Sequence, residues 1–143
     1  MASFTFTQNV GEQRYTSAAL GAATGTKLTT NDIGKAVKYG TANNVVLCAN
    51  GDEADGFLET VLDHTVNDGF AFGSAMTSGR MEVVVDSAEA GTAIAGSKMV
   101  AGTQTAIDTA GGPVMEIGAG LWKVIRVVSG TGVAGDTVMV EKI

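Results

Sequence analysis

The amino-acid sequence predicts an all-β protein, a small β-barrel, β-tulip or sandwich-like domain that follows an extended N-terminal arm. Turn-forming residues recur about every 8–12 residues over most of the chain. Between these turns, polar and apolar residues alternate with the period of two that is typical of half-buried strands. Glycine accounts for 20 of the 143 residues and proline for only one, which favours a β protein with many tight turns.

The length and charge of the chain limit its class. A chain of 143 residues fits one domain that can bury its own core. The formal charge of −6 and the scattered basic residues argue against binding to nucleic-acid backbones. Charged residues make up only 17% of the chain, which predicts that part of its surface is covered in an assembly. No membrane-spanning run and no signal peptide are visible, so we expect synthesis in the cytoplasm.

The first 26 residues differ from the rest. Residues 16–26 are small and mostly uncharged, with too little bulk to build a core. We therefore expect residues 1–26 to form an extended arm that is ordered by contact with something else, and a disordered tail is the equal alternative. The alternation of Phe4-Thr5-Phe6-Thr7 could add a strand to a sheet edge. Residues 27–143 are the expected β domain.

From residue 27 the elements follow regularly. Residues 30–34 predict a turn or one helical turn with Asx or Ser/Thr capping. Residues 59–66 could instead form a short helix, but Thr60, Val61, Thr65 and Val66 are β-branched and weaken that alternative. Strands are expected at residues 35–39, 45–49, 57–62, 70–72, 81–85, 94–100, 115–118, 121–128 and 137–142.

A weak internal repeat also emerges. The stretch Gly34-Lys35-Ala36-Val37, followed by residues 57–61, runs in the same order as residues 96–100 followed by residues 121–125. The offset is about 62 residues, and it predicts two similar β halves.

The most acidic stretch lies at residues 50–61. It carries four carboxylates, but it fails as an EF-hand calcium loop because Ala54 and Val61 stand where ligands are needed. A looser metal site of Asp52, Asp55 and Glu59 is the alternative. We expect mainly a turn, whose carboxylates keep one rim soluble or face basic residues of a neighbouring subunit.

Other motifs predict no catalytic, cofactor or metal site. Residues 130–135 match G-x-G-x-x-G, but a strand follows instead of a helix, so a hairpin loop is expected. His64 is the only histidine and has no recognisable nucleophile context. Cys48 is the only cysteine and lies in an apolar run, which predicts a small buried core residue.

Several of these segments together resemble the head decoration (capsid cement) proteins of tailed bacteriophages. The resemblance covers residues 27–143 and rests on a Gly-and-Val rhythm in residues 34–37, 50–61, 79–85, 94–100 and 135–140. It implies a non-enzymatic virion protein on the outer capsid surface that clamps neighbouring major capsid subunits. It also implies a homotrimer, with a dimer as the alternative.

The contact candidates are aromatic. Phe4, Phe6 and Tyr15 lie in the arm, and Trp122 is expected either to pack in the last hairpin or to lie at a subunit contact. The alternatives to a decoration protein are a tail-tube or fibre-associated β module and a carbohydrate-binding β module. The second is disfavoured because one Trp and two Tyr supply few stacking platforms. A small hydrolase is disfavoured by the single histidine.

Overall fold

The computed structural model describes the backbone of residues 15–20, 28–40, 44–62 and 71–143, and the side chains of residues 28–40, 44–61 and 73–143. Nearly all of the regular structure is β, which confirms the predicted class. The first five strands are β1 (Tyr15–Leu20), β2 (Ala36–Tyr39), β3 (Asn44–Leu47), β4 (Gly56–Leu62) and β5 (Ala71–Met76). The next five are β6 (Arg80–Val85), β7 (Lys98–Ala101), β8 (Val114–Ile117), β9 (Trp122–Ser129) and β10 (Thr137–Lys142).

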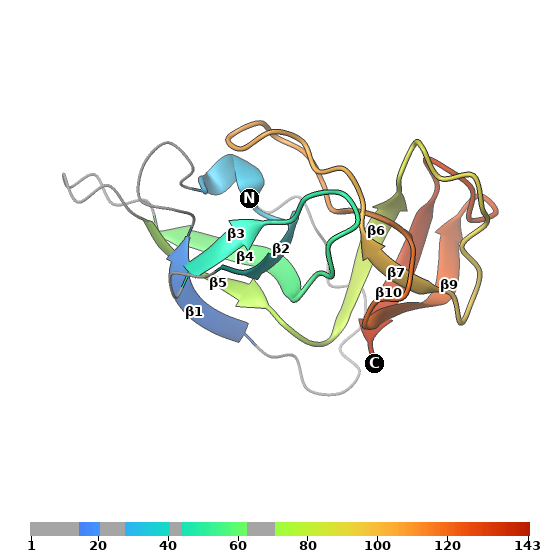
Figure 1. Ribbon diagram of the computed structural model, residues 1–143, viewed down its shortest axis with the longest axis horizontal. Coiled ribbons are helices and arrows are strands. Elements are labelled where there is room, and N and C mark those ends of the chain that lie inside the picture. The colour runs from blue at the N-terminus through green and yellow to red at the C-terminus, as the bar shows by residue number, and fades with distance from the viewer. Residues whose placement is uncertain (1–14, 21–27, 41–43, 63–70) are drawn as a thin grey trace.

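The strands form two closed barrels that stand side by side in Figure 1. The first has the cyclic order β1-β3-β2-β4-β5, and the second has the order β6-β8-β7-β9-β10. In each barrel the pair formed by its first and third strands is parallel, and the other pairs are antiparallel. The second barrel therefore repeats the topology of the first, which confirms the prediction of two similar β halves.

The repeat extends to a particular turn. Gly34 and Gly96 adopt φ values of 97° and 94°, which glycine reaches without the steric cost of a Cβ atom. Their N–H groups donate to Leu58 O and Val124 O, each at 2.7 Å. In each barrel this turn thus precedes the second strand (β2 or β7) and is hydrogen-bonded to the fourth (β4 or β9).

Most predicted elements have the expected type but different bounds. Residues 56–62 are a strand, so the helical alternative is wrong there, while residues 63–66 lie outside the described part. The strand predicted at residues 94–100 begins only at Lys98, because residues 94–97 form the turn that contains Gly96. The predicted helical turn is the 3₁₀ helix η1 (Thr30–Asp32), which has a capping box between Thr29 and Asp32.

The predicted arm overlaps the first barrel. The backbone of β1 pairs with β5 along its whole length and with β3 at its end, so this part of the predicted arm completes the barrel. Residues 1–14 and 21–27 lie outside the described residues. The division of the chain at residue 26 stays a prediction.

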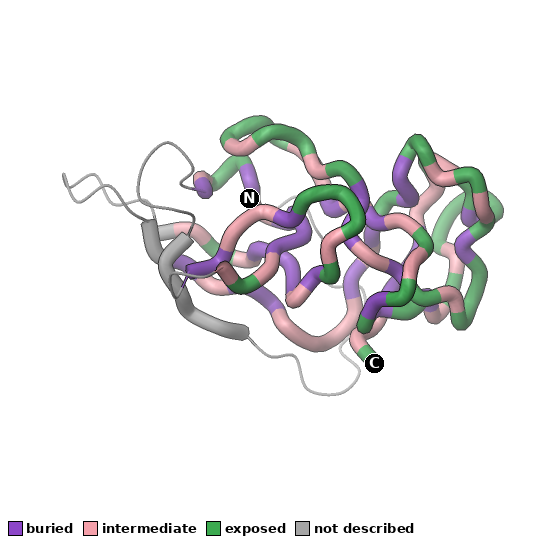
Figure 2. The backbone as a smooth tube through the Cα atoms, in the orientation of Figure 1, coloured by how far each residue is buried: buried purple, intermediate pink, exposed green. Residues whose placement is uncertain are grey.

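The apolar side chains form two clusters. The smaller cluster fills the first barrel and includes Leu28, Val37 and Leu58. The larger cluster fills the second barrel and continues to Ala36, Phe57 and Met76 of the first half. Figure 2 shows buried segments along the strands and where the barrels meet, with exposed stretches in the connecting loops. The barrels therefore share a core.

In the described part of the chain, no helix is long and apolar enough to cross a membrane.

Candidate functional site: the joint and the outer faces of the barrels

The acidic turn lies at the joint between the barrels. Gly51 N donates to Ala101 O at 2.8 Å, and Ala101 N donates to Asp52 O at 2.8 Å. These two backbone hydrogen bonds join this turn to the end of β7. Residues 50–55 therefore hold the second barrel onto the first, which agrees with their prediction as mainly a turn.

The carboxylates of the turn are used locally. Asp52 Oδ2 lies 2.6 Å from Lys38 Nζ and accepts from Ala49 N at 2.8 Å. The hydrogen bond from Lys38, followed by that from Ala49 N–H, lowers the pKa of Asp52 below its ordinary value. Asp55 Oδ2 accepts from Tyr39 N at 3.0 Å. Among the described residues, no group of three His, Cys, Asp or Glu side chains could hold a metal ion.

A buried lysine also connects the two halves of the molecule. The side chains of Lys35 and Asp32 are 0% exposed, and Lys35 Nζ lies 2.6 Å from Asp32 Oδ1. The ammonium also donates to three carbonyl oxygens of the loop between β7 and β8, at 2.6 Å (Thr109), 3.0 Å (Ala106) and 3.4 Å (Thr105). The loop returns a bond, because Asp108 N donates to Asp32. One cation thus holds a loop of the second half against the first.

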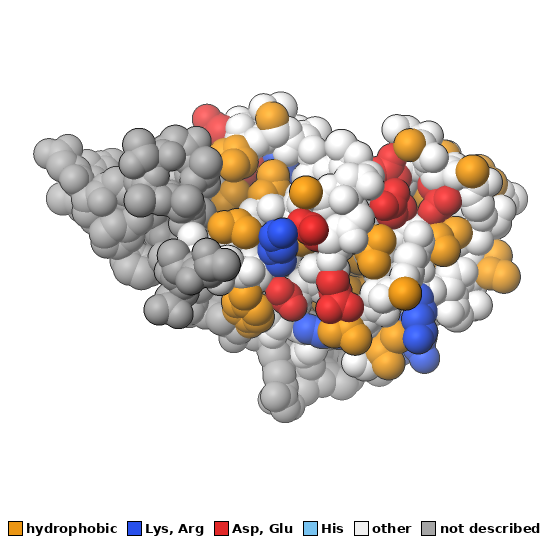
Figure 3. Space-filling model, viewed as in Figure 1, with side chains coloured by type: hydrophobic (Ala, Val, Ile, Leu, Met, Phe, Trp, Pro, Cys, Tyr) orange, Lys and Arg blue, Asp and Glu red, His pale blue; other side chains and the backbone are white. Residues whose placement is uncertain are grey.

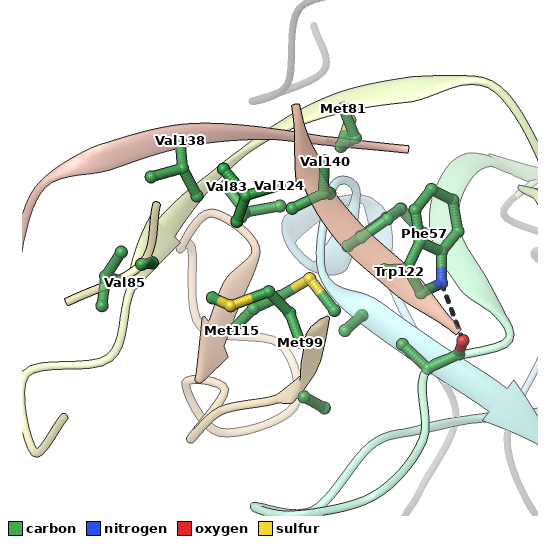
Figure 4. Close-up of a cluster of buried hydrophobic side chains, with 14 of the residues drawn as sticks. Phe57, Met81, Val83, Val85, Met99, Met115, Trp122, Val124, Val138 and Val140 are labelled. Carbon is green, nitrogen blue, oxygen red and sulfur yellow. Dashed lines mark hydrogen bonds between the residues drawn. The ribbon is translucent and has the colours of Figure 1, made fainter. Parts of the chain in front are cut away.

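Trp122 fills the centre of the joint. Its side chain is fully buried, and its ring meets Phe57 edge to face with centroids 4.9 Å apart. The indole Nε1 donates to Ala54 O at 2.9 Å, drawn as the dashed line in Figure 4. Of the two roles predicted for Trp122, packing is the one that the structure shows. The prediction of a subunit contact is corrected, because this side chain has no exposed surface.

The other contact candidates lie at the beginning of the chain. Phe4 and Phe6 fall outside the described residues. Tyr15 begins β1, where the backbone register places it opposite Met76. Its role in partner binding stays a prediction, as do those of the two phenylalanines.

His64 also lies outside the described part, whereas Cys48 is buried as predicted. Burial raises the pKa of its thiol to about 12, which keeps it protonated and unreactive.

The outer faces of the barrels differ at equivalent positions. In the first barrel, the backbone register aligns Ala36, Phe57 and Met76 across β2, β4 and β5. This row is apolar, fully buried and part of the shared core. The corresponding row across β7, β9 and β10 is Lys98, Lys123 and Glu141. The same row of the repeated fold is thus an interface in one barrel and a charged surface in the other. Sequence reasoning missed this row, because it appears only once the strands are paired.

Two carboxylates hold loops of the second barrel in place. Asp136 Oδ2 accepts from the backbone N–H groups of Thr131, Gly132 and Val133, which closes the predicted hairpin loop. Asp86, which is 3% exposed, accepts from Thr103 N at 2.7 Å and Ala88 N at 2.8 Å. The bond from Thr103 N–H, followed by that from Ala88 N–H, lowers the pKa of Asp86.

Asp86 should therefore contribute to stability in a pH-dependent way. Because its folded-state pKa is depressed, its contribution is fully present above the ordinary value of 3.8 and is lost as the pH falls through the folded-state pKa. We expect Asp86→Asn to lose about 1.5–3 kcal/mol of unfolding free energy at pH 7. Its stability should also decline less steeply in acid than that of the unchanged chain. Urea unfolding across pH 2–7 measures both effects, and parallel acid declines would contradict this role.

No protein-family model, curated protein or solved structure matches this chain.

Proposed function

We propose that this chain is a decoration (cement) protein that binds the outer surface of the expanded head of a tailed phage. It acts by binding rather than by catalysis, as a homo-oligomer, most simply a trimer, that joins neighbouring major capsid subunits. The resemblance of residues 27–143 to such proteins supports the proposal.

The observation that carries the proposal is the distribution of exposed apolar side chains. Single exposed apolar residues are ordinary on a protein surface, but their concentration on one unit favours an interaction surface there. Figure 3 shows several such side chains on the visible face of the second barrel. Among the described residues, one exposed large apolar side chain belongs to the first half, Tyr39, and seven belong to the second: Val84, Ile94, Ile117, Leu121, Val128, Val133 and Ile143.

Cosedimentation with emptied, expanded capsids tests the proposed function. We expect the chain to pellet with the capsids in a saturable way, and to show in solution a mass that is a multiple of 14.5 kDa. A monomer that ignores capsids but is retained on a glycan column would overturn the proposal in favour of a carbohydrate-binding module. Binding to isolated tails but not to heads would assign it to another part of the virion.

A truncation tests the arm. Because β1 closes the first barrel, the deletion that leaves both barrels intact is residues 2–14 rather than residues 2–20. We expect this deletion to leave the unfolding transition nearly unchanged and to weaken capsid binding, since an extended segment can add a strand to a partner's sheet. Equal capsid binding by the truncated and complete chains would remove the arm from the mechanism.

A further inference from the structure

Most of the described basic side chains are used inside the molecule. Four of the seven bind an acceptor within the chain: Lys35 with Asp32, Lys38 with Asp52, Arg80 with Glu141, and Lys142 with Asp55 O. The other three, Lys98, Lys123 and Arg126, are exposed and take part in no ion pair among the described residues. These three cations are therefore available to a partner.

The three unpaired cations lie together on β7 and β9. Lys98 stands directly opposite Lys123 in the antiparallel ladder. Arg126 follows three residues later on β9, and the β-bulge between Val124 and Arg126 returns it to the side of the sheet that Lys123 occupies, because their partners Met139 and Glu141 are two residues apart on β10. Like charges directly opposite each other on a sheet are destabilising. The nearest acid in the row, Glu141, is engaged by Arg80 at 2.7 Å. In Figure 3, Lys and Arg side chains gather at the lower right, over the second barrel. An acidic partner would relieve this repulsion.

A comparison of the two barrels supports a docking role for the row of Lys98, Lys123 and Glu141. The equivalent row of the first barrel, Ala36, Phe57 and Met76, is buried against the second barrel. There the contact is apolar and permanent. On the second barrel the same row presents ammonium groups, which suits a partner that binds from solution, because opposite charges steer association and set its register.

We propose that Lys98, Lys123 and Arg126 form a docking site for a carboxylate-bearing protein surface, which, resting on the proposed function, belongs to the coat lattice. Charge complementarity favours protein over nucleic acid as the partner. Glu82 and Glu141 flank the three cations, and the chain carries a formal charge of −6, whereas phosphate backbones are bound by extended basic surfaces.

One substitution separates docking from folding. Lys98→Glu places opposite charges across β7 and β9 and leaves an alternating row of charges through Lys123, Glu141 and Arg80. The isolated protein should therefore unfold at an equal or higher temperature. Its binding to expanded capsids should weaken roughly tenfold or more, with a shallower dependence on salt concentration. Lys98→Arg, which keeps the charge, is the matched control and should bind like the unchanged chain.

The outcomes distinguish the two proposals. If the unchanged chain binds capsids and Lys98→Glu binds them equally well, the docking site is overturned while the proposed function stands. If the unchanged chain does not pellet with capsids, the proposed function is overturned. The coat lattice is then also ruled out as the partner of the three cations. A change in self-association without a change in capsid binding would make a second copy of the chain the partner instead. If double-stranded DNA retained the unchanged chain but not Lys98→Glu, the partner would be a nucleic acid, and the proposal of a protein partner would be overturned.

Discussion

Replacing Lys35 by alanine is expected to lower the free energy of unfolding by about 3–5 kcal/mol. The ammonium is 0% exposed and lies between Asp32 and the loop that joins β7 to β8. Its removal leaves the Asp32 carboxylate buried without its counter-charge. It also leaves carbonyl oxygens of Ala106 and Thr109 without this donor. An uncompensated buried charge costs far more than the loss of an exposed ion pair.

Lys38→Ala is the matched control for this prediction. Lys38 also forms a 2.6 Å ion pair with an aspartate, but its side chain is 37% exposed. Its loss should cost only about 0–1 kcal/mol. Chemical denaturation compares the two variants, and hydrogen exchange should show faster exchange at residues 103–109 in Lys35→Ala alone. Similar losses from both variants would mean that burial does not strengthen the Lys35 pair.

Trp122→Ala is expected to cost about 3–5 kcal/mol, the other large effect. The substitution empties the centre of the joint, removes the edge-to-face contact with Phe57 and leaves Ala54 O without its indole donor. Because the joint and the interior of the second barrel form one cluster, the cavity weakens both at once. Trp122→Phe keeps much of the apolar volume but not the N–H group. Its free energy of unfolding should therefore lie between that of the unchanged chain and that of Trp122→Ala.

The neighbouring residue provides the control for Trp122. Leu121 is 41% exposed, and Leu121→Ala should change stability by no more than about 0.5 kcal/mol. Trp122 is the only tryptophan, so its fluorescence reports on the joint directly. Emission from the folded protein should be blue-shifted relative to the unfolded chain. An emission maximum in the folded state that equals that of the denatured protein would contradict the buried position.

Much of the fold could be predicted from the sequence, because its signals are local. Alternation with a period of two located β2, β6 and β10, and the capping residues around Thr30 located η1. The repeat was visible because Gly34 and Gly96 meet the same requirement for a positive φ before equivalent strands. Bounds were less accurate, as at residues 94–97, because a turn and a strand end share the same apolar composition.

The candidate surfaces were less predictable. The sequence showed nine scattered basic residues, and only strand pairing brings Lys98 opposite Lys123. Trp122 was a contact candidate because aromatic residues are enriched both in cores and at interfaces, and sequence alone does not separate these environments. Lys35 belongs to the same Gly-Lys-Ala-Val stretch that signalled the repeat. Nothing local marks it as buried, because its partners at residues 105–109 lie about 70 positions away.

The sequence by itself thus determined the all-β class, the turns and the division into two similar halves. These depend on interactions between neighbouring residues and on the backbone freedom of glycine. The tertiary structure decided that each half closes into a barrel and that the acidic turn bridges to β7. It also decided that one outer row is a buried joint and its counterpart a cationic face. Those outcomes depend on which strands pair and in what register, and such contacts join residues that are far apart in the chain.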